Sequence, residues 1–147
     1  MKPVIAATLI ALSTSPAFAE NVVKTSPLSV AETVDKLEAA VTGAGATVFA
    51  RIDHAEAAKT VGKDIPDATL LMFGNPTLGT LAMESDLRAG LVLPLRVLAY
   101  EDDAGATQLT WAPAEDLFDG LDIPADAEVI AKINGALNAL TDKATAE

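Results

Sequence analysis

The sequence contains no cysteine among its 147 residues. This absence excludes disulfide bonds, thiolate metal sites and a cysteine nucleophile. It also leaves no residue for the acylation that anchors a lipoprotein. The length predicts a single domain, and the hydrophobic content of 50% is sufficient for one packed core. The stability of the protein must therefore come from that core rather than from covalent cross-links.

Basic residues are scarce, with 10 lysines and arginines against 21 aspartates and glutamates and a formal net charge of -11. Nucleic acids and anionic membrane surfaces are bound through basic surfaces, so we expect neither as a partner. Histidine is rarer still, because His54 stands alone. Zinc sites draw on several histidine or cysteine ligands, and we therefore expect no metal site.

The chain has no hydrophobic run long enough to cross a bilayer. Residues 4–12 form an apolar run that is too short for a membrane span. Lys2 precedes this run, and residues 17–19 read Ala-Phe-Ala, the pattern of a cleavage site. We therefore predict that residues 1–19 are a signal peptide and that the rest is periplasmic or secreted, with no membrane anchor after cleavage. A retained N-terminal anchor is the alternative interpretation.

Patterns of strand and helix alternate in the first half of the remaining chain. Ser29 and Glu32 have the spacing of a capping box, which predicts a helix that begins at Ser29. The apolar run at residues 69–73 predicts a strand that is buried on both faces. The predicted elements are strands at residues 21–26, 47–52 and 69–73, a helix from residue 29 to the glycines at 43 and 45, and a helix from residue 53 to residue 62.

The second half is predicted to contain a β-hairpin and a long last helix. The turn at residues 102–105 favours a hairpin between its flanking strands. The polar tail from Asp142 is predicted to fray. The predicted elements are a helix at residues 77–87, strands at residues 94–100 and 107–111, a helix opening at Pro113, and a last helix with an apolar stripe of Val129, Ile130, Ile133, Leu137 and Leu140. Residues 20–147 thus predict one α+β domain, a two-layer mixed β-sheet with helices packed on it.

Three segments resemble the signatures of the DUF302 family. They are F-A-R-I-D-H-A-E-A-A at residues 49–58, L-L-M-F-G-N-P at residues 70–76 and G-L-V-L-P-L-R-V-L at residues 90–98. The resemblance covers roughly residues 22–118. It implies a two-layer α+β domain that commonly forms homodimers, and it implies no established activity. The sequence departs from the family pattern at Asp67 and Ala82, where the family has proline, and at Val92, where the family has aspartate.

The adjacent Asp53 and His54 are the first candidate site. A carboxylate beside an imidazole has the groups of a general acid–base pair. The alternative is structural, with Asp53 as the helix N-cap and His54 in the first turn.

The turn from Gly74 to Thr80 is the second candidate, because glycine-rich turns between a strand and a helix expose backbone N–H groups that hold anions. It lacks the lysine of a phosphate-binding loop, so we expect neither ATP nor GTP. The alternative is an ordinary turn in which Gly74 and Asn75 supply unusual dihedral angles and Pro76 supplies rigidity. The methionines and aromatic residues fit core positions, and we expect no cofactor.

Arg51 and Arg96 are the third candidate, because each lies on a predicted strand. A buried arginine needs a partner, so we expect a carboxylate such as Glu101 or Asp53 beside each, or a bound ligand. Clustered with His54 and Asn75, the two arginines would form an anion-binding pocket, and Lys59 would extend it.

Three functions are left open by these residues. The favoured one is a binding module for a small anionic or polar ligand, with Asn75, Arg96, His54, Gly74, Thr80 and Arg51 as ligand-binding residues. A protein-interaction domain without a small-molecule site is the alternative. An enzyme with His54 as general base, supported by Asp53, has less support because no nucleophile motif is present. The first hypothesis requires that His54, Asn75 and Arg96 converge on one cavity.

Overall fold

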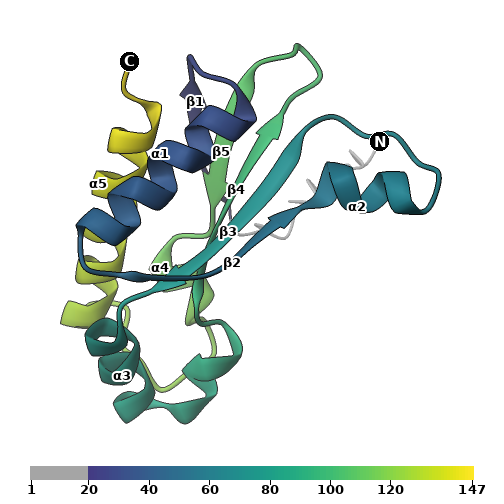
Figure 1. The fold of residues 1–147 in the computed structure, drawn as a ribbon. Helices are drawn as coiled ribbons and strands as arrows, with labels where there is room; N and C mark the ends of the chain where they lie inside the picture. Colours follow the sequence, from purple (N-terminus) through teal and green to yellow (C-terminus); the bar gives the residue numbers. More distant parts are fainter. Residues whose placement is uncertain (1–19) are drawn as a thin grey trace, which may run out of the picture.

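The computed structural model describes residues 20–147, and the predicted signal peptide lies outside the described residues. A five-stranded sheet has the order β1-β5-β4-β3-β2, and every neighbouring pair is antiparallel (Figure 1). The strands are β1 (Val22–Ser26), β2 (Thr47–Asp53), β3 (Ala68–Gly74), β4 (Leu95–Glu101) and β5 (Thr107–Trp111). The predicted α+β class is confirmed. The sheet is antiparallel rather than mixed, because the one crossover joins the edge strands β1 and β2, which do not pair.

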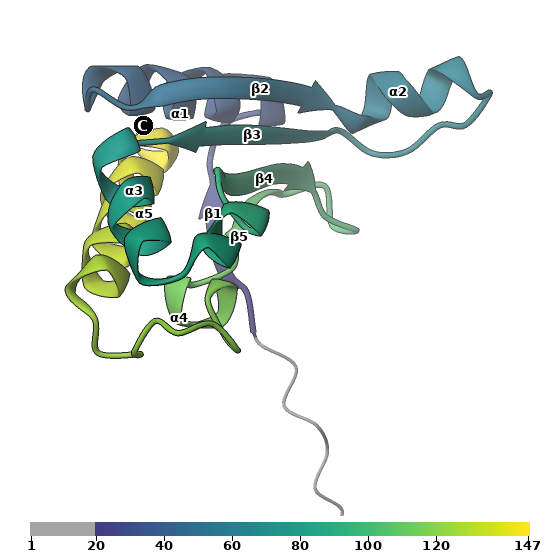
Figure 2. The same ribbon diagram turned by 90° about the horizontal axis from the view of Figure 1, so that it is seen from below.

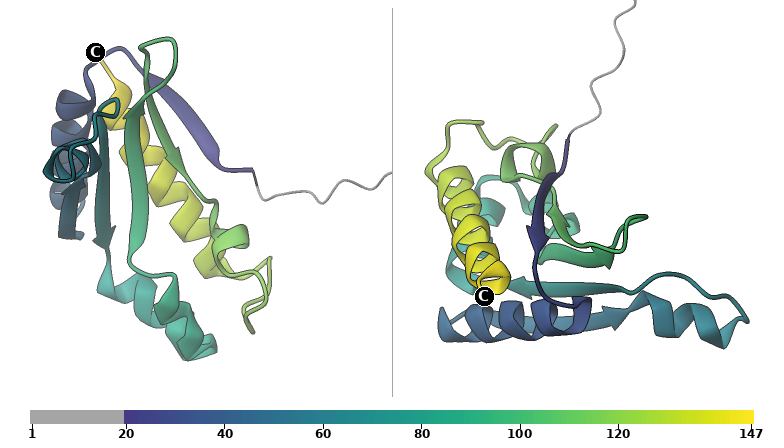
Figure 3. Two further views of the ribbon diagram at one scale, coloured as in Figure 1. Left: turned by 90° about the vertical axis from the view of Figure 1, so that its right-hand side faces the viewer. Right: turned by 90° about the horizontal axis from the view of Figure 1, so that it is seen from above.

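Two long helices cover one face of this sheet. They are α1 (Val30–Gly43) and α5 (Glu128–Thr145), which also pack against each other (Figure 3). Leu71 and Phe73 of β3 point into the core beneath them, whereas Leu70 and Met72 on the other face are only half-buried. The prediction that this strand is buried on both faces is therefore wrong, because no helix of residues 20–147 covers the outer face.

Local sequence signals explain the ends of the long helices. The capping box of α1 is confirmed: the Ser29 hydroxyl accepts a hydrogen bond from the Glu32 backbone N–H, and the Glu32 carboxylate accepts one from the Ser29 backbone N–H. The apolar stripe of α5 is buried as predicted. The fraying predicted from Asp142 onward is wrong, because α5 continues to Thr145. The Lys24 ammonium lies 2.6 Å from the Asp142 carboxylate, and Ala144 is fully buried.

The shorter helices lie at opposite ends of the sheet. Figure 2 shows α2 (His54–Thr60) at the far tip of the β2–β3 arm, away from α5. The helix α3 (Pro76–Ser85) and the 3₁₀ helix η1 (Leu87–Leu91), which the sequence did not predict, lie at the other end. A single turn, α4 (Ala114–Leu117), contacts α5. Among residues 20–147, no helix has the length and apolar character that a membrane crossing requires.

Candidate functional site

The pairing of β2 with β3 separates two of the predicted site elements. Thr47 lies opposite Gly74, and Asp53 lies opposite Thr69, so His54 and Asn75 lie at opposite ends of the ladder. Six residues of strand correspond to about 20 Å. The hypothesis that His54, Asn75 and Arg96 converge on one cavity is therefore wrong, because an antiparallel pair carries the two motifs in opposite directions.

The structural interpretation of Asp53 is confirmed. Its carboxylate accepts a hydrogen bond of 2.8 Å from the Glu56 backbone N–H and caps α2. His54 is the first residue of that helix and is exposed. Lys59, the predicted extension of the site, pairs with Glu56 on the same helix at 3.3 Å. This end of the sheet therefore presents a capped, solvated helix.

Arg51 and Arg96 lie on opposite faces of the sheet. The Arg51 guanidinium lies 2.5 Å from the Asp35 carboxylate and 3.4 Å from that of Glu38, both on α1. The pKa of Arg51 is raised, chiefly by the hydrogen bond to Asp35. The interpretation of an internal ion pair is confirmed for Arg51, with carboxylates other than those predicted. Arg96 is exposed on the outer face, and its guanidinium lies 3.5 Å from the Val92 carbonyl oxygen.

The turn after β3 has ordinary backbone geometry. Asn75 is the N-cap of α3, and its side-chain oxygen accepts a hydrogen bond of 2.9 Å from the Thr77 backbone N–H. The prediction of unusual dihedral angles is wrong, because neither Gly74 nor Asn75 has a positive φ. Gly74 has a steric role instead. A Cβ at this position would lie 3.3 Å from Cε2 of Phe49, so the glycine lets that ring lie against the backbone.

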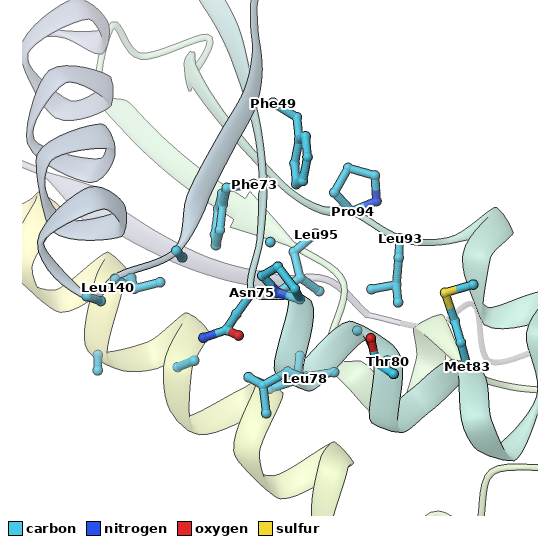
Figure 4. A pocket seen from close by; sticks show the side chains of 18 of the residues that line it. Phe49, Phe73, Asn75, Leu78, Thr80, Met83, Leu93, Pro94, Leu95 and Leu140 are labelled. Carbon is cyan, nitrogen blue, oxygen red and sulfur yellow. The ribbon is translucent and has the colours of Figure 1, made fainter.

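A cavity of about 540 Å³ lies at this end of the sheet (Figure 4). Its walls come from α3, η1, α5, the strands β2 and β3, the start of β4 with the segment before it, and the loop between α1 and β2. The residues labelled in Figure 4 are Phe49, Phe73, Asn75, Leu78, Thr80, Met83, Leu93, Pro94, Leu95 and Leu140. Of the predicted ligand-binding residues, Gly74, Asn75 and Thr80 line this cavity, whereas Arg51, His54 and Arg96 do not.

The cavity wall is almost entirely apolar. Among residues 20–147, Asn75, Thr80 and Lys143 are the three lining residues with polar side chains, and no carboxylate of these residues lines the cavity. In Figure 4 the Asn75 side chain points toward α5. With its oxygen occupied by the Thr77 N–H, Asn75 offers its amide N–H groups, and Thr80 offers a hydroxyl. This wall can surround an apolar molecule and donate hydrogen bonds to it, but it contains no acid–base pair.

Sequence reasoning missed the contribution of α5 to this wall. Ala136, Ala139 and Lys143 recur at spacings of three and four residues and therefore share one side of the helix, beside the buried stripe. Small side chains at two of these positions leave space that larger residues would fill. The helical spacing of these alanines is the signal in the sequence that marks the wall.

Asp86 fixes the junction between α3 and η1, next to the cavity. Its side chain is 7% exposed, and its carboxylate lies 2.6 Å from the Arg88 guanidinium and accepts the Asp122 backbone N–H at 3.0 Å. The hydrogen bonds from Arg88 and then from Asp122 hold the pKa of this carboxyl far below its usual range. The ionised carboxylate thus holds η1, which carries Gly90 into the cavity wall, and the loop at Asp122 between α4 and α5.

Fold and cavity together define an antiparallel α+β domain with one apolar cavity at the end of its sheet. The model of the family "Domain of unknown function DUF302" matches residues 22–140, and the chain belongs to this family. A solved structure of the same family, the uncharacterized conserved protein DUF302 from Bacillus stearothermophilus, is similar with a TM-score of 0.77 and 22% identity. This similarity covers 84% of this chain and 97% of that one, and it concerns the fold.

Part of the chain is also similar to longer proteins. Two proteins named "Fluoride-specific ion channel FluC 1", from Brucella suis biovar 1 and Brucella abortus biovar 1, are each 44% identical to it over 82 residues. The match covers 56% of this chain, and 32% and 30% of those proteins. The chain thus spans about a third of the length of these relatives.

Proposed function

We propose that this domain is a binding module for a small, mainly apolar molecule that occupies the cavity between α3 and α5. The observation that carries this proposal is a cavity of about 540 Å³ without a carboxylate in its wall, in a chain with 21 acidic residues. Ligand sites of small molecules are concave, largely apolar and of about 300–1,000 Å³, with a few polar groups that orient the ligand. Asn75 and Thr80 supply such groups here.

This proposal revises the kind of ligand expected from the sequence. An anionic or polar molecule was expected to meet Arg51, Arg96 and His54, none of which lines the cavity. Hydrogen-bond donors remain at the wall, so the ligand has an apolar body with a polar end. Catalysis by His54 has less support, because that residue is exposed at the far end of the β2–β3 arm.

Binding of Nile red, a neutral apolar dye, tests the proposal. We expect saturable fluorescence enhancement with one dye per chain. Ala136→Trp fills the cavity from α5 and should weaken binding by at least an order of magnitude, since a close-packed wall does not yield to a large side chain. Ala57→Trp, on the exposed side of α2, is the matched control and should bind as the unmodified chain does. Equal affinity of all three proteins would contradict the proposal.

We further propose that the partner of this domain is a second copy, bound through the outer face of the sheet. One row of outward residues crosses all five strands: Ile52, Leu70, Leu98, Thr110 and Val23. Ile52 and Val23, at its two ends, are 38% and 52% exposed. A two-fold axis through the middle of the row would place each apolar end against the other, as an isologous contact requires.

Charge and area are compatible with this contact. The rows on either side add Arg96 and Tyr100 but no carboxylate, so two acidic chains can approach here without direct repulsion. Five strands of this length present a face of about 24 Å by 20 Å, from strand spacing and rise. Two such faces remove roughly 1,000 Å² from water, the lower bound for specific interfaces.

Light scattering coupled to size-exclusion chromatography tests the homodimer. We expect twice the chain mass for the unmodified protein and the chain mass for Leu98→Glu, which places a charge at the centre of the row. Leu91→Glu is the control, because Leu91 is an exposed leucine on η1 outside the sheet. The interface would be contradicted if the unmodified chain were monomeric, or if Leu91→Glu were monomeric as well as Leu98→Glu.

A second candidate function is that of an accessory domain that supports a membrane ion channel. It is supported by the two Brucella relatives, whose name is that of a fluoride channel and of which this chain matches about a third. Growth in graded fluoride, with and without the gene for this chain, tests it. Greater fluoride sensitivity on deletion, restored by the gene, is expected, and unchanged sensitivity would contradict it.

We also propose that the chain is exported, on the strength of the signal-peptide pattern at residues 1–19. The measured mass of the periplasmic or secreted protein should be that of a chain that begins at Glu20. A chain of full mass retained in the cytoplasm would contradict export.

A further inference from the structure

We infer that the ligand of the cavity is an amphipathic anion, with an apolar body inside the cavity and a carboxylate at the Lys143 ammonium. This inference rests on the proposed function, because it specifies the chemistry of the same site. Lys143 is the one charged residue among those of the described chain that line the cavity. Any charged end of a ligand placed at this wall therefore meets a cation.

The surroundings of Lys143 leave its charge available to a ligand. Most basic side chains of residues 20–147 are in ion pairs, as Arg51 is with Asp35 and Lys132 with Glu128. Within the same residues, Lys143 forms no ion pair and no hydrogen bond. A carboxylate beside it would gain a charge-assisted hydrogen bond without displacing a protein partner.

The other polar groups of the wall favour the same class of ligand. The Asn75 amide N–H groups and the Thr80 hydroxyl are both able to donate hydrogen bonds, and a carboxylate is an acceptor. No lining carboxylate repels an anion or attracts an ammonium group. The apolar remainder of the wall excludes a small inorganic anion as the preferred ligand, because such an ion keeps its water and gains little from apolar contact.

The net charge of the protein predicts the opposite, a preference for cations over anions. An experiment that compares anions with cations therefore separates the effect of Lys143 from the effect of the net charge. With a formal net charge of -11, the chain as a whole attracts cations and repels anions. If the cavity nevertheless binds an anion more tightly than a cation with the same apolar chain, the preference must come from the charged and polar groups that line the cavity. Three probes of equal chain length separate the two effects: dodecanoate, dodecanol and dodecylammonium, each used below its micelle concentration.

Displacement of Nile red measures the three affinities. The unmodified chain should bind dodecanoate about fivefold more tightly than dodecanol, the upper range for an exposed ion pair, and dodecylammonium least tightly. Lys143→Met should abolish the preference for dodecanoate over dodecanol, and Lys143→Glu should place dodecylammonium first. The preference should also weaken with added salt, since exposed charges are screened.

Lys63→Glu is the matched control, because it makes the same change of charge at an exposed lysine that does not line the cavity. It should leave the order of the three probes unchanged. Equal binding of dodecanoate and dodecanol by the unmodified chain, or the same reversal from Lys63→Glu, would overturn the inference and leave the apolar site intact. Failure of Nile red to bind would remove the proposed function as well.

Discussion

The two ends of the β2–β3 ladder differ in kind, although the sequence marks both with polar motifs. At one end, Asp53 and His54 begin a short exposed helix and face solvent. At the other, Asn75 begins a helix that packs beside α5 and closes an apolar cavity. In each case the polar residue at the strand end caps a helix. What makes one end a candidate site is the apolar wall from distant segments, which the other end lacks.

The difference shows that the presence of titratable residues does not by itself locate a site. Asp53, His54 and Arg51 carry the groups most often associated with chemistry, yet each is paired within the protein or exposed to solvent. The cavity has one amide, one hydroxyl and one lysine in an apolar wall. Four predictions sharpen or break this contrast.

The largest effect is expected in the core beside the cavity. Phe73 is 1% exposed, and Phe73→Ala should lower the free energy of unfolding by about 3–5 kcal/mol, because a large side chain is lost and a void remains. Val61→Ala, after α2, removes a side chain that is 73% exposed and should cost no more than about 0.5 kcal/mol. Urea denaturation measures both. A large loss for Val61→Ala would mean that the α2 end is buried in solution.

Asp86→Asn should lower the melting temperature by a few degrees at neutral pH, because it weakens the contacts with Arg88 and Asp122. Because the folded pKa of Asp86 is far below its unfolded value, its stabilisation is present above the unfolded pKa of about 3.9 and is lost as the pH falls below it. Melting curves between neutral and strongly acidic pH should therefore fall more steeply for the unmodified chain than for Asp86→Asn. If the melting temperatures of the two proteins fell equally with decreasing pH, Asp86 would not be a source of the acid sensitivity of the fold.

Cap removal compares the two ends directly. Asp53→Ala and Asn75→Ala each remove one N-cap hydrogen bond and should each cost about 1 kcal/mol in stability. Only Asn75→Ala should weaken Nile red binding, because only Asn75 lines the cavity. Equal losses of dye affinity would place the binding site elsewhere.

The smallest effect is expected for His54→Ala. His54 is exposed at the first position of α2, so its removal should change neither stability, within about 0.5 kcal/mol, nor dye binding. Thermal melting and titration with Nile red check both. A marked loss of dye binding would restore His54 to the site.

Much of the fold was predictable because it follows from local signals. The capping box at Ser29, the cap at Asp53 and the stripe of α5 concern residues a few positions apart, and the structure confirms them. Strand pairing is a property of the whole chain. The antiparallel register that separates His54 from Asn75 depends on which strands become neighbours, and no local pattern determines this.

The candidate site was less predictable for the same reason. Gly74, Asn75 and Thr80 were identified from their turn, but the wall formed by Ala136, Ala139 and Lys143 lies more than fifty residues further along the chain. The ion partners of Arg51 were missed because Asp35 and Glu38 come from a helix that crosses over the strand.

The contact of the first strand with the last helix determines when the domain can complete its fold. The Lys24 ammonium donates hydrogen bonds to the Thr141 hydroxyl and the Asn138 carbonyl oxygen as well as to Asp142, and β5 is the only strand of residues 20–147 that pairs with β1. Such long-range pairings form late and slowly. In an emerging chain, β1 stays unpaired until β5 (Thr107–Trp111) is delivered, and it meets α5 (Glu128–Thr145) only when nearly all residues are delivered, so the contact of the sheet edge with its covering helix is completed last.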